Sequence, residues 1–228
     1  MSAAAVVVHG LWMPGTETAI LRRRLAAAGL PARCFRYRTV SEGLDANAAR
    51  LAELVDALPE DTVHLVGHSL GGVLIRHMLE RFPPARPGRV VALGSPFTGC
   101  CAGRALAAYG LGRTLLGKCM LELLESGGCR EWRGPRELGI IAGDVGLGFG
   151  RLVCRLPEPN DGTVAVAETR LPGATDHLVL HVTHTSMLWS PEVAQQTLCF
   201  LRTGRFAHEE EAAVKIAAGK PLPPGPSA

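Results

Sequence analysis

Apolar strand patterns that alternate with amphipathic helix patterns predict an α/β fold for this chain of 228 residues. Short β-branched runs such as residues 3–8 are continuously apolar, as expected of strands that are buried on both faces. A helix between two such strands implies a right-handed crossover between parallel strands. We therefore expect a mostly parallel central sheet with helices on both faces.

The first part of the chain supplies three strand and helix pairs. The expected elements are a strand at 3–8, a helix at 18–28, a strand at 33–37, a helix from about 41 to 58, a strand at 62–67 and a helix at 70–81. Gly29 suits the end of the first helix, and Ser41 is expected to cap the second. Leu44, Leu51 and Leu54 recur at helical spacing along that second helix.

In the second part of the chain, two segments interrupt the alternation of strands and helices. Further strands are expected at 89–94, 138–142 and 177–183, and a closing helix at 191–201 has Pro191 in its first turn. Between them, residues 97–135 are predicted to be a helical insert or a cap over the site, with an apolar stretch around 106–124. Residues 1–208 are thus expected to form one domain. The Pro-rich tail at 209–228 is expected to lack regular structure.

Composition excludes several classes of function. The chain is 47% hydrophobic with a net charge of +3, its arginines are dispersed and its aromatics amount to 5%, so we expect no nucleic-acid partner. No apolar run is long enough to cross a bilayer, so no stable membrane insertion is expected, and residues 1–10 do not resemble a secretion signal.

The seven cysteines are odd in number and lack paired CxxC spacing, which argues against a zinc site and favours reduced thiols in a cytoplasmic protein. A disulfide among the four cysteines from Cys100 to Cys129 stays open as an alternative.

The segment Gly67-His68-Ser69-Leu70-Gly71 has the pattern G-x-S-x-G between an expected strand and an expected helix. A sharp turn at this junction strains the serine backbone and projects its hydroxyl above the sheet. Glycines two before and two after the serine remove side chains that would collide in the turn. The helix that starts behind the serine also favours developing negative charge. We therefore predict Ser69 as a nucleophile.

An anionic tetrahedral intermediate needs two backbone N–H donors. One is expected from Leu70, directly after the nucleophile, and the other from Leu11 in the loop that follows the first strand. Gly10 allows close backbone approach there. Trp12 is expected to form a wall of the substrate pocket, and His68 to line the pocket rather than act as the base.

Ser69 needs a histidine base and a carboxylate that orients it, in the chain order serine, acid, histidine. His184 follows the last expected strand and is our choice of base; His181, expected inside that strand, and His177, expected before it, are alternatives. Asp161 lies in the turn sequence Asn-Asp-Gly, where backbone amides can hold it ionised, and is our choice of acid. Asp144 is the main rival, and Asp176 and Glu168 are lesser ones.

These motifs, in this order, resemble the α/β-hydrolase superfamily, and within it the compact bacterial lipases and the inositol-deacylase-like group. The resemblance covers residues 3–206 and implies the α/β-hydrolase fold. It implies Ser69, Asp161 and His184 as the catalytic triad, and the Leu11 and Leu70 amides as the oxyanion hole.

The predicted activity is hydrolysis of a small-molecule or lipid ester through an acyl-enzyme, which needs no metal and no organic cofactor. Leu106, Leu111, Leu115 and Leu116 are candidates for the acyl site, with an ordinary core role as the alternative. Thioesterase or acyltransferase activity, a non-catalytic binding scaffold, and action at a membrane surface through residues 111–124 stay open. Oligomeric state is not determined by the sequence.

Overall fold

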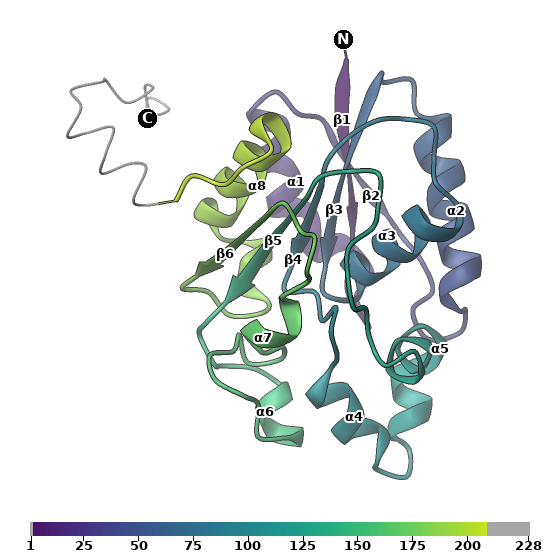
Figure 1. Ribbon diagram of the computed structural model, residues 1–228, viewed down its shortest axis with the longest axis vertical. Coiled ribbons are helices and arrows are strands. Elements are labelled where there is room, and N and C mark those ends of the chain that lie inside the picture. Colours follow the sequence, from purple (N-terminus) through teal and green to yellow (C-terminus); the bar gives the residue numbers. More distant parts are fainter. Residues whose placement is uncertain (1, 209–228) are drawn as a thin grey trace, which may run out of the picture.

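The computed structural model describes residues 2–208, and the tail expected to lack regular structure lies outside them. Six strands form one sheet in the order β2-β1-β3-β4-β5-β6, and every neighbouring pair is parallel (Figure 1). The strands are β1 (Ala3–Val8), β2 (Ala32–Phe35), β3 (Thr62–His68), β4 (Val90–Leu93), β5 (Leu138–Gly143) and β6 (Asp176–Leu180). The predicted parallel α/β sheet is confirmed.

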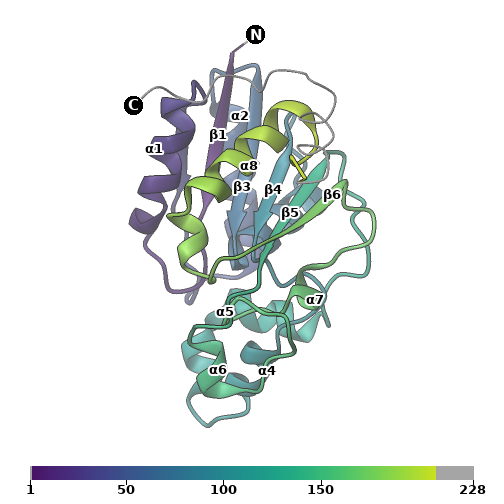
Figure 2. The ribbon, with the colours of Figure 1, turned by 90° about the vertical axis from the view of Figure 1, so that its left-hand side faces the viewer.

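Two pairs of helices cover the two faces of the sheet. The helices α1 (Ala19–Ala27) and α8 (Pro191–Thr203) lie on one face, and α2 (Leu44–Ala57) and α3 (Leu70–Arg81) on the other (Figures 1 and 2). Strand β1 alternates between the two apolar clusters: Ala5 and Val7 pack on the α1 and α8 side, Val6 and Val8 on the α2 and α3 side. Burial on both faces explains why this strand is apolar throughout.

The remaining helices gather at the carboxyl ends of the strands (Figure 2). They are α4 (Cys101–Ala107), α5 (Gly112–Glu125), α6 (Gly150–Val153) and α7 (Val166–Thr169), together with the 3₁₀ turns η1 (Thr16–Thr18) and η2 (Ser186–Leu188). The helical stretch expected at 106–124 is therefore divided into α4 and α5. Gly117, with φ of 70°, kinks α5. No helix within residues 2–208 is long and apolar enough to cross a membrane.

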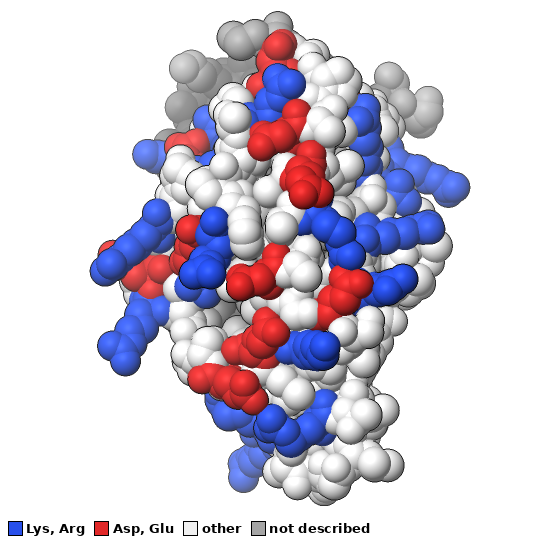
Figure 3. All heavy atoms as spheres, turned by 90° about the vertical axis from the view of Figure 1, so that its right-hand side faces the viewer, with Lys and Arg blue, Asp and Glu red and all other residues white. Residues whose placement is uncertain are grey.

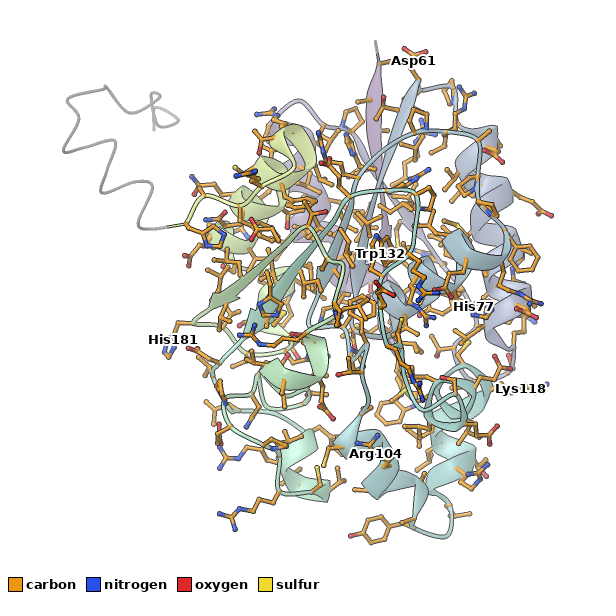
Figure 4. All side chains as sticks on the ribbon, viewed as in Figure 1. Asp61, His77, Arg104, Lys118, Trp132 and His181 are labelled. Atoms are coloured by element: carbon orange, nitrogen blue, oxygen red, sulfur yellow. The ribbon has the colours of Figure 1, made fainter. Side chains whose placement is uncertain are left out.

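Three local expectations are wrong. Ser41 does not cap α2: the helix begins at Leu44, whose N–H donates to the carboxylate of Glu122 in α5 at 2.7 Å. Strand β6 ends at Leu180, so His181 lies beyond the strand and is exposed instead of packed inside it (Figure 4). His177, in turn, lies within β6 and not before it.

The seven cysteines are free thiols, so the alternative of a disulfide among Cys100, Cys101, Cys119 and Cys129 is not realised. The sulfur atoms of Cys101 and Cys154 lie 3.2 Å apart and join α4 to the end of α6.

Three histidines are held uncharged inside the fold. Burial lowers the pKa of His64 in β3 to about 4, that of His177 in β6 to about 4 and that of His68 to about 3. His64 Nδ1 accepts the Arg89 N–H at 3.0 Å, and a hydrogen bond of 2.9 Å joins His177 Nε2 to the Thr169 hydroxyl. Burial thus disfavours the charged form of all three rings, and the contact with Arg89 also requires an unprotonated Nδ1 on His64.

These rings predict a loss of stability in acid. In the unfolded chain these histidines become protonated below their ordinary pKa of 6.5. In the folded protein they stay neutral until the pH reaches about 3 to 4. The free energy of unfolding should therefore fall as the pH drops from 6.5 to 4, by up to about 1.4 kcal/mol per pH unit for each ring. Urea unfolding at several pH values measures this. His64→Gln, which keeps an acceptor for Arg89, should flatten the slope by roughly one proton; an unchanged slope in that variant would contradict the assignment.

Candidate active site

Ser69 occupies a strained turn between β3 and α3. Its φ of 53° and ψ of −122° lie in a region that residues other than glycine rarely adopt. A Cβ on Gly67 would lie 2.4 Å from the Gly72 nitrogen, and one on Gly71 would lie 2.3 Å from the Val8 carbonyl oxygen. Both glycines are thus required by close backbone approach, as the sequence predicts. The turn presses the start of α3 onto the end of β1.

The loop after β1 is held by the buried ring of His9. Its Nε2 accepts the Tyr37 N–H at 3.3 Å, which leaves the proton on Nδ1 to donate to the Gly10 carbonyl at 2.9 Å. Burial lowers the pKa of His9, so the ring stays neutral in this role. Because a trans peptide directs its C=O and N–H oppositely, the Leu11 N–H points away from the His9 ring. Leu11 and Leu70 border the same cavity.

Asp161 and His184 form a buried pair. The Asp161 side chain is 1% exposed, and its Oδ2 lies 2.7 Å from His184 Nδ1. Its Oδ1 accepts the amides of Thr163 and Val164 at 2.9 and 2.7 Å. The His184 N–H also donates to the Asp161 carbonyl at 2.8 Å, which ties the two loops together. The carboxylate is therefore fixed in place. It occupies Nδ1 of His184, so Nε2 is the ring nitrogen available to other groups.

Gly94, at the end of β4, makes room for this pair. A Cβ there would lie 3.0 Å from Asp161 Oδ2 and 3.1 Å from His184 Nδ1, and the φ of 57° is one that glycine adopts without strain. Sequence analysis missed this residue, although its position directly after a buried strand was a usable signal.

The other carboxylates considered as the acid are engaged elsewhere. Asp144 contacts His181 Nδ1 at 2.9 Å on the surface, and Asp176 contacts His208 Nε2 at 2.9 Å. Glu168 accepts the amides of Cys101 and Ala165, so that it joins the start of α4 to α7. Of the four candidates, only Asp161 is brought to His184.

His68 lines the cavity and also contacts His184. The ring is fully buried, which lowers its pKa to about 3, and its Nε2 donates to the His184 carbonyl at 2.9 Å. The two ring centroids lie 4.7 Å apart. His68 therefore fixes the backbone of His184 through this hydrogen bond. Its place next to Ser69 in the sequence does not indicate this contact.

Trp12 lines the cavity and joins the loop after β1 to the helices around the site. It has a positive φ of 60°. Its indole N–H donates to the Leu115 carbonyl at 2.7 Å, and its ring meets Phe149 edge-on at 6.0 Å between centroids. Trp12 thus spans the gap between α5 and the segment before α6.

A cavity of about 220 Å³ opens at Ser69, and its lining is mainly apolar. Ser69, His68, His184, Leu11, Leu70 and Trp12 all border it. Leu106 and Leu116 do so as well, whereas Leu111 and Leu115 do not and are 76% and 55% exposed. Phe149 and Met120 are lining residues that sequence analysis missed, because they come from segments that only the fold brings together. Within residues 2–208 no group of three His, Cys, Asp or Glu side chains is arranged to hold a metal ion.

The comparison that decides the family is a match over residues 5–214 to the model of the alpha/beta hydrolase family. The chain belongs to the α/β-hydrolase family. The resemblance stated from the motifs is therefore confirmed at the level of the family. No curated protein matches the chain.

Solved structures with the same architecture include the mature lipase BlEst2 from Bacillus licheniformis, at a TM-score of 0.69 and 19% identity over 87% of this chain and 90% of that one. The metagenomic carboxyl esterase MGS0156 has a TM-score of 0.58 and 19% identity over 81% and 65% of the two chains. Phospholipase PlaB from Legionella pneumophila, in complex with thio-NAD, has a TM-score of 0.58 and 14% identity over 95% and 61%. At such identities these similarities show the fold alone.

The strain at Ser69 can be measured as stability. Ser69→Gly should unfold with a free energy about 1 kcal/mol higher than Ser69→Ala, because only glycine adopts a φ of 53° without a steric penalty. Both variants lose the hydroxyl, so the difference reports the backbone alone. Equal stability of the two variants, or greater stability of Ser69→Ala, would show that the turn is unstrained.

Proposed function

We propose that this α/β hydrolase is a serine esterase that cleaves carboxylic esters through an acyl-enzyme on Ser69. The observation that carries the proposal is the buried contact of 2.7 Å between Asp161 and His184 on the cavity that Ser69 borders. Because His184 Nδ1 faces the Asp161 carboxylate, the neutral ring carries its proton on Nδ1. Nε2 is then the nitrogen that can accept a proton.

In the proposed reaction the Ser69 hydroxyl attacks the ester carbonyl while His184 Nε2 takes the hydroxyl proton. The oxyanion that forms is stabilised by the N–H groups of Leu11 and Leu70, and its collapse expels the alcohol, which takes the proton from His184. Water then attacks the acyl carbonyl while His184 takes a proton from it. The bond between the acyl group and Ser69 breaks, His184 returns the proton to the Ser69 oxygen, and the carboxylic acid leaves. Asp161 holds the imidazole and stabilises its charged form throughout. The chain's own residues supply every proton transfer.

The apolar cavity supports an acyl site for a hydrophobic chain. Leu106 and Leu116 line it, and Trp12 and Phe149 stand at its open side, half exposed at 49% and 50%. The structural similarity to a lipase and a carboxyl esterase favours ester cleavage among the activities that this fold supports. All seven thiols are free, so a reducing compartment such as the cytoplasm is part of the proposal.

A fluorophosphonate probe tests the nucleophile. The purified protein should be labelled at Ser69, located by peptide mass spectrometry, and labelling should vanish in Ser69→Ala and His184→Ala because each removes one half of the activated pair. A folded protein that is not labelled and cleaves no ester would be a binding scaffold instead of an enzyme.

The acid is tested by a matched pair of isosteric changes. Asp161→Asn should lower kcat for a soluble p-nitrophenyl ester at least about 100-fold, because the amide cannot hold the required tautomer and charge of His184. Asp144→Asn, which alters only the exposed contact with His181, should change kcat less than about threefold. Comparable losses in the two variants would overturn the assignment of Asp161.

The acyl site is tested by adding bulk inside and outside the cavity. Leu106→Trp should lower kcat/KM for an octanoyl ester about tenfold more than for an acetyl ester, because it fills space that the longer chain needs. Leu111→Trp places the same side chain on an outward-facing position of the neighbouring turn and is the control. An acyl-length dependence shared by both variants would place the acyl chain elsewhere.

A further inference from the structure

Exposed apolar side chains are concentrated at one end of the molecule. Six of the large ones come from two segments, the turn from α4 into α5 with the start of α5, and the loop before α6 with α6 itself: Tyr109, Leu111, Leu115, Leu147, Phe149 and Leu152. Their exposed fractions run from 50% to 82%. We call these six residues the apolar rim. The other exposed large apolar side chains of residues 2–208 are less exposed than these six, and Trp12, beside Leu115, is 49% exposed.

The apolar rim lies beside the cavity. Phe149 borders the cavity itself, and the backbone of Leu115 binds the Trp12 indole, which also borders it. Tyr109 and Leu111 follow Leu106, whose side chain points into the cavity. The contact of Cys101 with Cys154 holds α4 and α6 next to each other, so the two segments form one surface.

The charge on these segments is mainly basic, although Arg113 is paired with Glu125 at the end of α5 at 2.9 Å. Residues 99–118 contain Arg104, Arg113 and Lys118 and no acidic residue, and residues 145–155 contain Arg151 and Arg155 and no acidic residue. In Figure 3 the lower tip of the molecule is white and blue, and acidic side chains begin directly above it. Arg104 lies on α4, between the two segments (Figure 4). Large apolar side chains flanked by basic ones suit an interface with anionic lipid.

We propose that the apolar rim docks the protein on the surface of an anionic phospholipid membrane, so that ester substrate enters the cavity directly from the lipid layer. The statement that the substrate is an ester rests on the proposed function. A second copy of this chain fits the rim less well, because a symmetric dimer would bring two basic surfaces together and close the cavity. The rim adsorbs to the membrane and does not span it.

On the sequence alone, action at a membrane surface stays open only for residues 111–124. The structure moves the surface away from most of that segment, since Leu116, Met120 and Leu123 are buried against the core. The loop that leads into α6 replaces them, and its contribution depends on tertiary proximity to α4.

The test is co-sedimentation of the full chain with vesicles of phosphatidylcholine, with and without about one third phosphatidylglycerol. The full chain should bind the anionic vesicles. The double variant L111S/L152S removes two side chains that do not line the cavity and should lower the partition coefficient at least about tenfold. R151S/R155S should weaken binding to anionic vesicles and not to neutral ones, an effect that added salt should mimic.

The matched control is I20S/V179S, which removes two exposed apolar side chains from α1 and β6, away from the rim. This variant should bind vesicles as the unmodified protein does. Turnover of a soluble acetyl ester should be unchanged in L111S/L152S, whereas hydrolysis of an ester carried in anionic vesicles should fall with the loss of binding.

Absence of vesicle binding by the unmodified protein, or equal binding by L111S/L152S, would overturn the docking proposal while soluble-ester turnover still supports the esterase. Vesicle binding by a protein that cleaves no ester would retain the docking surface and remove the proposed function. A concentration-dependent dimer in light scattering that L111S/L152S abolishes, without vesicle binding, would identify the rim as an interface between copies.

Discussion

The close approach of α3 to the end of β1 is the constraint on which the rest of the site depends. Gly71 lies so near the Val8 carbonyl that no side chain fits between them. This contact places Ser69 at the start of α3 directly beside the loop that carries Gly10 and Leu11. Because β1 and β3 are neighbouring parallel strands, their carboxyl ends meet at one edge and bring both groups to the same point. The strain at Ser69 persists because packing on both sides leaves the turn no other conformation.

A second set of contacts holds the histidine and its carboxylate against this edge. Asp161 receives two backbone N–H groups from its own turn and one side-chain contact from His184. His68 holds the His184 carbonyl, and Gly94 lets both side chains lie against the end of β4. The site is thus built from rigid strand ends and short loops, which is the arrangement that keeps reacting groups aligned without further rearrangement.

Long-range polar contacts hold the starts of two helices, α2 on the sheet face and α4 at the carboxyl ends of the strands. Glu122 in α5 accepts the first N–H of α2, and Glu168 accepts the N–H of Cys101 at the start of α4. Trp12 connects the loop after β1 to α5 through the carbonyl of Leu115, near the kink at Gly117. Contacts of this kind position the helices around the small apolar cavity beside Ser69. Several large apolar side chains of these helices stay exposed to solvent.

The sequence by itself determined what depends on local geometry. Continuously apolar runs and helical patterns locate the strands and the main helices, and Gly67 and Gly71 mark the turn at Ser69 because that turn tolerates no side chain there. The turn chemistry of residues 160–164 likewise indicated a carboxylate that accepts backbone amides. Only the tertiary structure decided which carboxylate meets His184, that Glu122 and not Ser41 caps α2, and which leucines face the cavity. These contacts join residues far apart in the chain, and a local pattern carries no information about which distant partner occupies the space beside it.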